Sequence, residues 1–241
     1  LTFTLRADGT NVFAPGNKWG IFPAASAAWR ISDESFMEWS KDWLSTLKMR
    51  ASYGKSGNAR VGSYWRQTYS PVTSTKNLYY QNEIGQSSLQ PAKRLRNENL
   101  TWESKFSTNV GFDLGFFSNR INLTFDYYND VTKDLIMEVQ LPSNAGYSSQ
   151  YQNLGQTTNR GVELSLNANL VQTKDFYLDF NFNIAFNKNK VDALYGANGD
   201  EMILSGGGTE TGSDNYRVFV GQEVGLMYGY VSDGMYSLDR K

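Results

Sequence analysis

Apolar and polar residues alternate along much of this 241-residue chain. The longest alternating segment reads KDFYLDFNFNIAFNKNKV at 174–191, and its apolar members are Phe176, Leu178, Phe180, Phe182, Ile184 and Phe186. Successive side chains of a β-strand point to opposite faces, whereas a helix would scatter both sets around its circumference. The segment therefore predicts a strand with one apolar face and one neutral polar face.

The same period predicts further strands along the chain. Alternating runs occupy 1–5, 25–31, 47–53, 110–116, 121–127 and 162–170. Ser118-Asn119-Arg120 forms a tight connection between two of these runs, and VQTKD at 171–175 connects two others. Connections this short join antiparallel neighbours, so both pairs are predicted hairpins.

One segment between strands predicts a helix instead. SDESFMEWSKDWL begins at Ser32, a candidate N-cap, and places Asp33 and Glu34 in the first turn. Its continuation spaces Phe36, Ser40, Trp43, Leu44 and Leu47 near one face. We expect a short amphipathic helix here.

The connections alternate in length. Those at 118–120 and 171–175 are short, whereas 54–100, 137–158 and 188–215 are long and rich in Gly, Ser, Asn and Tyr. Consecutive antiparallel connections lie at opposite ends of a sheet, so the long ones gather at one end. Outer-membrane barrels show this asymmetry, with short periplasmic turns and long outer loops.

The strands themselves also fit a membrane barrel. Runs of about ten residues span a bilayer at a barrel's tilt, while soluble strands commonly have about five or six residues. The apolar positions at 176–186 carry no charge, which fits a lipid-facing surface, where a midplane Arg or Lys costs roughly 2–4 kcal/mol. Aromatic residues near strand ends are candidates for interfacial girdles: Trp19, Trp29, Tyr53, Trp102, Tyr127 and Tyr128. We therefore predict an all-β fold, part of an antiparallel transmembrane β-barrel.

Two alternatives use the same alternation. A soluble β-sandwich, such as a carbohydrate-binding module, would bury the apolar face against a second sheet. A passive porin or adhesin barrel would place that face in lipid without any energy coupling. The loop asymmetry favours a barrel over the sandwich.

Composition removes several classes of function. The formal net charge is -1, which leaves no general positive field for nucleic acid. The chain has no Cys and no His, so it has no disulfide, no Cys/His zinc site and no His-dependent catalytic triad. YGKSG at 53–57 lacks the earlier Gly of a phosphate-binding loop, because Met49 stands there. We expect no enzymatic role, no cofactor and no metal site.

Acidic residues on the polar face are the remaining candidates for catalysis. Glu163 and Asp179 lie on adjacent predicted strands, and a pair of carboxylates is the requirement for glycoside hydrolysis. Asp113 and Asp126 also lie on adjacent predicted strands and are a second candidate pair of carboxylates. We favour electrostatic or hydrogen-bonding roles inside the barrel for all four.

One long connection concentrates aromatic and polar side chains. SYWRQTYSPVTSTKNLYY at 63–80 contains the candidate ligand-binding residues Tyr64, Trp65, Arg66, Tyr69, Tyr79 and Tyr80. Aromatic faces stack on sugar rings or peptide side chains while guanidinium and amide groups form hydrogen bonds. The alternative is that these aromatics pack the loop against its neighbours.

Longer stretches of the chain carry a family resemblance. They read ADGTNVFAPGNKWGIFPAASAAWRISDESFM, LSTLKMRASYGKSGNA, NENLTWESKFSTNVGFDLGFFSNRINLTFDYYNDVTKDLI, LPSNAGYSSQYQNLGQTTNRGVELSLNANL and VGQEVGLMYGYVSDGMY. In this order they resemble the SusC/RagA family of TonB-linked outer-membrane transporters. The loops at 59–90 and 195–215 resemble it least.

The resemblance implies a plugged barrel of roughly 22 strands, of which residues 1–241 supply about six or seven. The plug, the TonB-binding segment and the C-terminal closing strand are expected to lie outside these residues. The implied function is import of glycans, oligosaccharides or peptides across the outer membrane of a Gram-negative cell. The implied partners are a SusD-like surface lipoprotein acting as a lid, the TonB complex and outer-membrane lipid.

Overall fold

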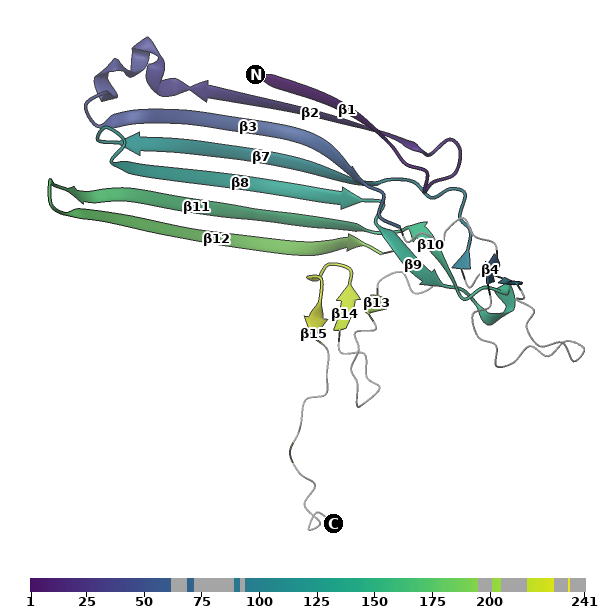
Figure 1. The fold of residues 1–241 in the computed structure, drawn as a ribbon. Helices are drawn as coiled ribbons and strands as arrows, with labels where there is room; N and C mark the ends of the chain where they lie inside the picture. Colours follow the sequence, from purple (N-terminus) through teal and green to yellow (C-terminus); the bar gives the residue numbers. More distant parts are fainter. Residues whose placement is uncertain are drawn as a thin grey trace, which may run out of the picture.

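A computed structural model describes residues 1–61, 69–71, 89–91, 94–194, 201–204, 216–227 and 234. Its main feature is one seven-stranded sheet of order β1-β2-β3-β7-β8-β11-β12, antiparallel throughout (Figure 1). The strands are β1 (Thr2–Gly9), β2 (Trp19–Arg30), β3 (Leu44–Asn58), β7 (Glu103–Phe116), β8 (Ile121–Lys133), β11 (Gln156–Gln172) and β12 (Tyr177–Ala193). The prediction of six or seven antiparallel wall strands is confirmed.

Smaller sheets lie at the end of the long strands where the long connections gather, which is the right-hand end in Figure 1. β9 (Ile136–Gln140) pairs with β10 (Ser149–Asn153), which also pairs with β6 (Arg94–Leu95). β4 (Tyr69–Pro71) pairs with β5 (Leu89–Pro91). β13 (Glu201–Leu204), β14 (Tyr216–Phe219) and β15 (Leu226–Met227) form a third small sheet. We call this the loop end and the opposite one the turn end.

The turn end holds the short connections. At 117–120, Phe117, Ser118 and Asn119 all have positive φ, and the turn joins β7 to β8 as predicted. At 173–176, the Phe176 amide donates to Thr173 Oγ1, so Phe176 lies in the hairpin instead of on the strand. The expectation that Phe176 belongs to the strand's apolar row is therefore wrong.

The predicted helix at the turn end is also wrong in type. The segment forms two short 3-10 helices, η1 (Ile31–Asp33) and η2 (Ser35–Ser40), and a further one, η3 (Ser143–Ala145), lies at the loop end. Arg30, not Ser32, occupies the cap position, and no side chain caps η1. Leu44 and Leu47 belong to β3, because their pairing with β7 ends the helical segment. In the described residues, no helix is long and apolar enough to cross a membrane.

Strand pairing gives the sheet two chemically different faces. One row across six strands joins Trp29, Met49, Phe112, Phe125, Leu164 and Ile184, all in register. Paired residues of an antiparallel sheet point to the same side, so such rows form one apolar face, and the alternate residues form a polar face. The alternation read from the sequence is therefore preserved across strand boundaries.

The apolar face is exposed in this single-layered structure. Phe180, Phe182 and Phe186 have exposed fractions of 46%, 44% and 66%. Among the described residues no second sheet covers this face, as a soluble β-sandwich requires. Large contiguous apolar surfaces mark contact with another molecule or with lipid.

The long strands extend further than the alternation predicted. β3 continues to Asn58 and β12 to Ala193, into segments that we expected to be loops. The expected loop at 137–158 contains β9, β10 and the start of β11. Backbone pairing with a neighbouring strand continues where both faces become polar, so the sequence pattern ends before the strand does.

Candidate functional site

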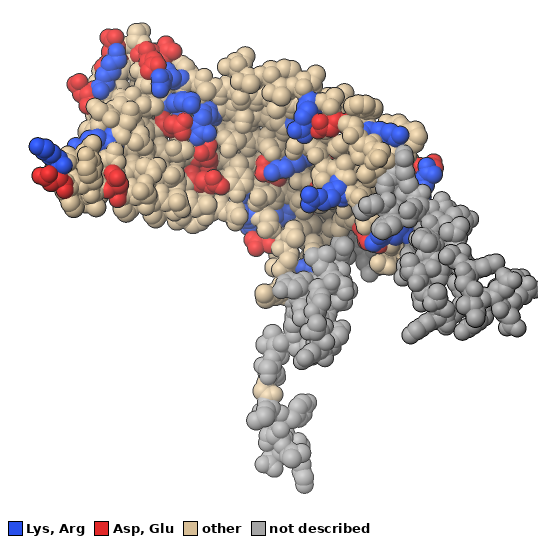
Figure 2. All heavy atoms as spheres, viewed as in Figure 1, with Lys and Arg blue, Asp and Glu red and all other residues tan. Residues whose placement is uncertain are grey.

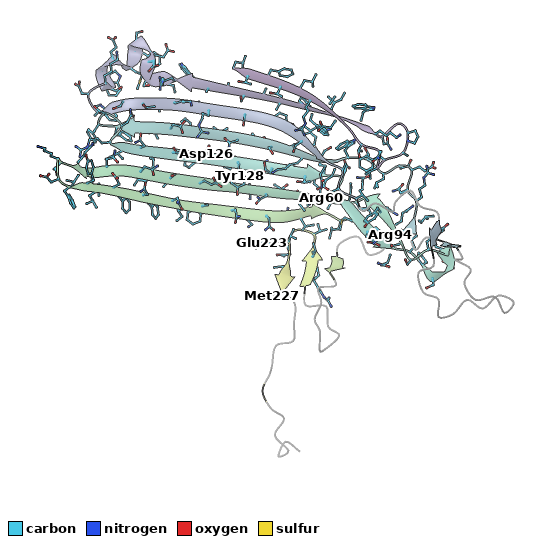
Figure 3. The ribbon with its side chains drawn as sticks, in the orientation of Figure 1. Arg60, Arg94, Asp126, Tyr128, Glu223 and Met227 are labelled. Carbon is cyan, nitrogen blue, oxygen red and sulfur yellow. The ribbon has the colours of Figure 1, made fainter. Side chains whose placement is uncertain are left out.

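The middle of the polar face carries a row of charged residues. Arg50, Gly111, Asp126, Glu163 and Ala185 lie in register across β3, β7, β8, β11 and β12. Figure 2 shows basic and acidic side chains adjoining one another over the middle strands. Figure 3 places Asp126 near the middle of the sheet. This row is the candidate site, because an arginine on one strand contacts carboxylates from two other strands here.

Arg50 is held by two aspartates. Its Nε lies 2.9 Å from Asp113 Oδ2 and its Nη2 lies 3.0 Å from Asp113 Oδ1, a two-pronged contact. The same Nη2 donates to Asp126 Oδ2 at 3.1 Å. Lys48 Nζ lies 3.8 Å from Asp113 Oδ2. Charge-assisted, bidentate contacts of this kind fix both distance and orientation.

Gly111 makes the contact between Arg50 and Asp126 possible. β7 lies between the strands that carry these two residues, and Gly111 is the β7 residue in their row. A Cβ atom at this position would stand 2.3 Å from Asp126 Oδ1 and 2.9 Å from Arg50 Nη2. Only glycine therefore leaves room for the guanidinium to reach across β7.

The row holds more negative charge than Arg50 neutralises. Glu163 is directly opposite Asp126, is exposed, and forms no ion pair within the described part of the chain. Asp126 Oδ1 is buried without a hydrogen-bond partner among the same residues. The polar face therefore presents acceptor groups and negative potential at this point.

The structure separates the two carboxylates, Glu163 and Asp179, that were considered for glycoside hydrolysis. Glu163 faces Ala185 on β12, and Asp179 lies six residues further along that strand. At a rise of about 3.3 Å per residue this is roughly 20 Å. Glycoside hydrolases hold their two carboxyl groups about 5–9.5 Å apart. The separation of Glu163 and Asp179 does not fit such a pair, and an electrostatic or hydrogen-bonding role for each stays a prediction.

A second close contact on the polar face involves Tyr128 and Gly161. A Cβ atom at Gly161 would lie 2.6 Å from Tyr128 Oη and 2.6 Å from the Phe186 carbonyl oxygen. Tyr128 thus lies across β11 on the polar side, so its assignment to a lipid-interface girdle is wrong. The adjacent Tyr127 lies on the apolar face.

Beyond the row, a small apolar core closes the loop end. Trp102 meets Phe13 at a ring-centroid distance of 5.7 Å and Phe22 at 5.4 Å, both edge-on. Phe13, Phe22 and Leu100 are buried. Asn17 Nδ2 donates to the Leu100 carbonyl, which ties the β1–β2 connection to the start of β7. Trp102 is therefore a core residue, and its assignment to the girdle is wrong.

An ion pair connects strands of the small sheet β6-β10-β9 at the loop end. Arg94 Nε lies 2.7 Å from Glu138 Oε1 and Arg94 Nη2 lies 2.9 Å from Glu138 Oε2. The hydrogen bond from Arg94, assisted by one from Ser149, holds the pKa of Glu138 below its usual value. The same bond raises the pKa of Arg94, whose guanidinium also lies 5.2 Å from the Tyr151 ring centre.

The predicted ligand-binding residues fall mostly outside the described structure. Tyr64, Trp65, Arg66, Tyr79 and Tyr80 lie outside the described residues, and Tyr69 is placed only as the first residue of β4. Sequence reasoning selected Asp113 and Asp126 for the polar face but missed Arg50. A signal existed, because Arg50 shares the alternation phase of the polar positions in 47–53.

Comparison with known proteins shows the family of this chain. The family model for the β-barrel of TonB-dependent receptors matches residues 1–231. The chain belongs to this family. Its members are outer-membrane proteins, which agrees with the exposed apolar face, so the soluble-sandwich alternative is wrong.

Individual relatives refine this assignment. The TonB-dependent receptor SusC of Bacteroides thetaiotaomicron is 34% identical over 219 residues, covering 90% of this chain and 22% of SusC. TonB-dependent receptor P3 of Formosa agariphila is 34% identical over 236 residues, covering 98% of this chain and 23% of the receptor. The structure of the RagAB peptide transporter matches with a TM-score of 0.76 and 27% identity, over 91% of this chain and 22% of that one. The resemblance to SusC/RagA transporters is confirmed, and the chain spans under a quarter of the length of these relatives.

Proposed function

We propose that residues 1–241 form part of the barrel wall of a TonB-dependent importer in the outer membrane. The observation that carries this proposal is the single-layered sheet, with one apolar face exposed along its length and one polar face. Lipid covers the first face and the lumen lies against the second. The plug and the closing strand belong to parts of the transporter outside these residues.

The imported substrates are glycans, oligosaccharides or peptides. The structural match to RagAB, a peptide transporter, supports peptides within this range. The lumen face presents amide, hydroxyl and carboxylate groups, which bind sugars and peptide backbones through hydrogen bonds. Tyr64, Trp65, Arg66, Tyr69, Tyr79 and Tyr80 are the proposed ligand or lid contacts. The chain's role is transport without catalysis.

The proposed partners follow from the same relatives. A SusD-like surface lipoprotein covers the loop end, and the TonB complex acts through the N-terminal part of the transporter. Energy coupling distinguishes this importer from a passive porin or adhesin barrel. Family membership supports coupling, since the matching model describes TonB-dependent receptors.

The test uses the full-length transporter with its neighbouring lipoprotein in a host strain that lacks both. Uptake of fluorescent oligosaccharides and of fluorescent peptides is measured with TonB intact and with TonB deleted. We expect TonB-dependent accumulation of one of the two substrate classes. Uptake that continues unchanged without TonB would identify a passive pore instead.

A further inference from the structure

A group of cations lies on the apolar face of the sheet, immediately beyond the apolar rows at the loop end. Val162 and Phe186 are paired in the last apolar row of β11 and β12. Two residues further, Arg160 is paired with Lys188, and the next row on this face pairs Thr158 with Lys190. Arg160, Lys188 and Lys190 are all exposed. We call these three residues the outer cation group.

The length of the apolar band places this group at a membrane boundary. On β12 the apolar positions run from Leu178 to Phe186, which is nine residues. A tilted membrane strand needs about 9–11 residues to cross the hydrocarbon region. β12 nevertheless continues to Ala193. Lys188 and Lys190 therefore stand where the strand leaves the hydrocarbon and enters the headgroup layer.

The pairing of Arg160 with Lys188 is unfavourable unless an anion is present. Like charges directly opposite on neighbouring strands destabilise a sheet. Neither side chain forms an ion pair with any described residue. The acidic residue on the same face of β12 is Asp192. Its carboxylate already forms an ion pair with Lys190 at 3.8 Å and accepts hydrogen bonds from Gln156 at 3.3 Å and from Thr158. Arg160 and Lys188 thus have no acidic partner within the described ranges.

Cations at the turn end are arranged differently. Arg30 lies 3.6 Å from Asp33, and Lys41 lies 3.5 Å from Glu38. These side chains have acidic neighbours within the protein, so they require no external anion. Among the described residues, the directly opposed pair of cations without an acidic partner, Arg160 and Lys188, lies at the loop end.

We propose that the outer cation group binds the phosphate groups of the anionic glycolipid in the outer leaflet of the membrane. The guanidinium of Arg160 matches a phosphate through two parallel N–H bonds, and the two ammonium groups add charge. The acyl chains of the same lipid lie along Val162 and Phe186, so one molecule satisfies both surfaces. This inference rests on the proposed orientation, with the loop end on the outer surface.

The test measures lipid binding to the purified full-length transporter in detergent. Native mass spectrometry records binding of diphosphoryl lipid A, dephosphorylated lipid A and phosphatidylglycerol to the wild type and to R160Q/K188Q. We expect the variant to bind diphosphoryl lipid A roughly tenfold more weakly, since each cation near an anionic surface contributes to attraction. The matched control K41Q/K174Q removes the same charge at the turn end and should bind as the wild type does. Heat-modifiable mobility in gels shows that every variant forms a folded barrel.

Three results would overturn the inference: equal lipid A binding by wild type and R160Q/K188Q, equal loss in the control, or stronger binding of phosphatidylglycerol than of lipid A. The result is separable from the uptake experiment. If lipid A binding depends on Arg160 and Lys188 but no TonB-dependent uptake occurs, the lipid site stands and the proposed import function fails.

Discussion

Arg50 Nη2 on β3 lies 3.1 Å from Asp126 Oδ2 on β8, although β7 runs between the two strands. The contact spans two strand spacings and joins residues 76 positions apart in the sequence. With the two bonds to Asp113, it fixes three consecutive strands of the wall to one guanidinium. Replacements in this network therefore report on the packing of the lumen face.

The R50M substitution should destabilise the barrel by about 1–3 kcal/mol, between the values for exposed and buried ion pairs. It leaves Asp113, Asp126 and Glu163 close together without their principal cation. The measurement is urea unfolding of the full-length transporter refolded into lipid vesicles. R50K is the control, and we expect it to recover part of the loss because lysine keeps the charge without the bidentate contact. An R50M barrel as stable as the wild type would show that the network carries no net stability.

The G111A substitution should break the contact between Arg50 and Asp126 without changing any charge. Its new Cβ would overlap Asp126 Oδ1, which has to move. We expect the losses of stability caused by G111A and by R50M to be non-additive, since both substitutions remove the same contact between Arg50 and Asp126. The double variant G111A/R50M, measured under the same unfolding conditions, should resemble the more destabilised single variant. Full additivity would contradict the role given to Gly111.

Arginine at Phe180 and at Asn181 should have opposite consequences. The two positions are neighbours on β12, but Phe180 lies on the apolar face, which we propose contacts lipid, and Asn181 lies on the polar face, which we propose lines the lumen. F180R should impair barrel assembly by roughly 2–4 kcal/mol, because lipid cannot hydrate the charge. N181R is the matched control and should assemble normally. The amount of heat-modifiable barrel in outer membranes measures both, and equal tolerance would refute the assignment of the faces.

The ion pair between Arg94 and Glu138 should make the loop end sensitive to acid. The pKa of Glu138 is lowered in the folded state, so its stabilising contribution is complete above the ordinary pKa of Glu, about 4.3. That contribution is lost as pH falls through the lower folded value. The protection of the β9 and β10 amides against hydrogen exchange, corrected for the intrinsic pH dependence of exchange, should therefore fall only below about pH 4. In E138Q the same amides should already be less protected at neutral pH and should show no such step.

The W65A/Y69A substitution tests the proposed aromatic ligand contacts. Loss of stacking should weaken binding of the imported oligosaccharide or peptide by roughly tenfold, about 1.4 kcal/mol. Calorimetric titration of the full-length transporter with its lipoprotein provides the measurement. Y177A serves as the control, because Tyr177 lies at the turn end of β12. Unchanged affinity in W65A/Y69A would remove these two residues from the binding site.

Much of the wall was determined by the sequence alone. Period-two alternation located the seven long strands, because a pleated strand with two different environments must alternate. Tight connections at 118–120 and 171–175 located two hairpins and, with the long connections, the two ends of the sheet. The absence of Cys and His and the near-zero net charge exclude whole classes of chemistry from composition alone.

Only the tertiary structure decided which residues meet. Trp102 and Tyr128 are aromatic residues of the kind found in interfacial girdles. Trp102 instead packs on Phe13 and Phe22, and Tyr128 lies across Gly161. The segment at 32–44 was expected to be one helix, but it forms two short 3-10 helices, and β3, paired with β7, begins at Leu44. Alternation assigns a residue to a face, whereas strand register decides its neighbours. That is why the sequence placed Asp126 on the polar side, and only the paired strands brought it to Arg50 across Gly111.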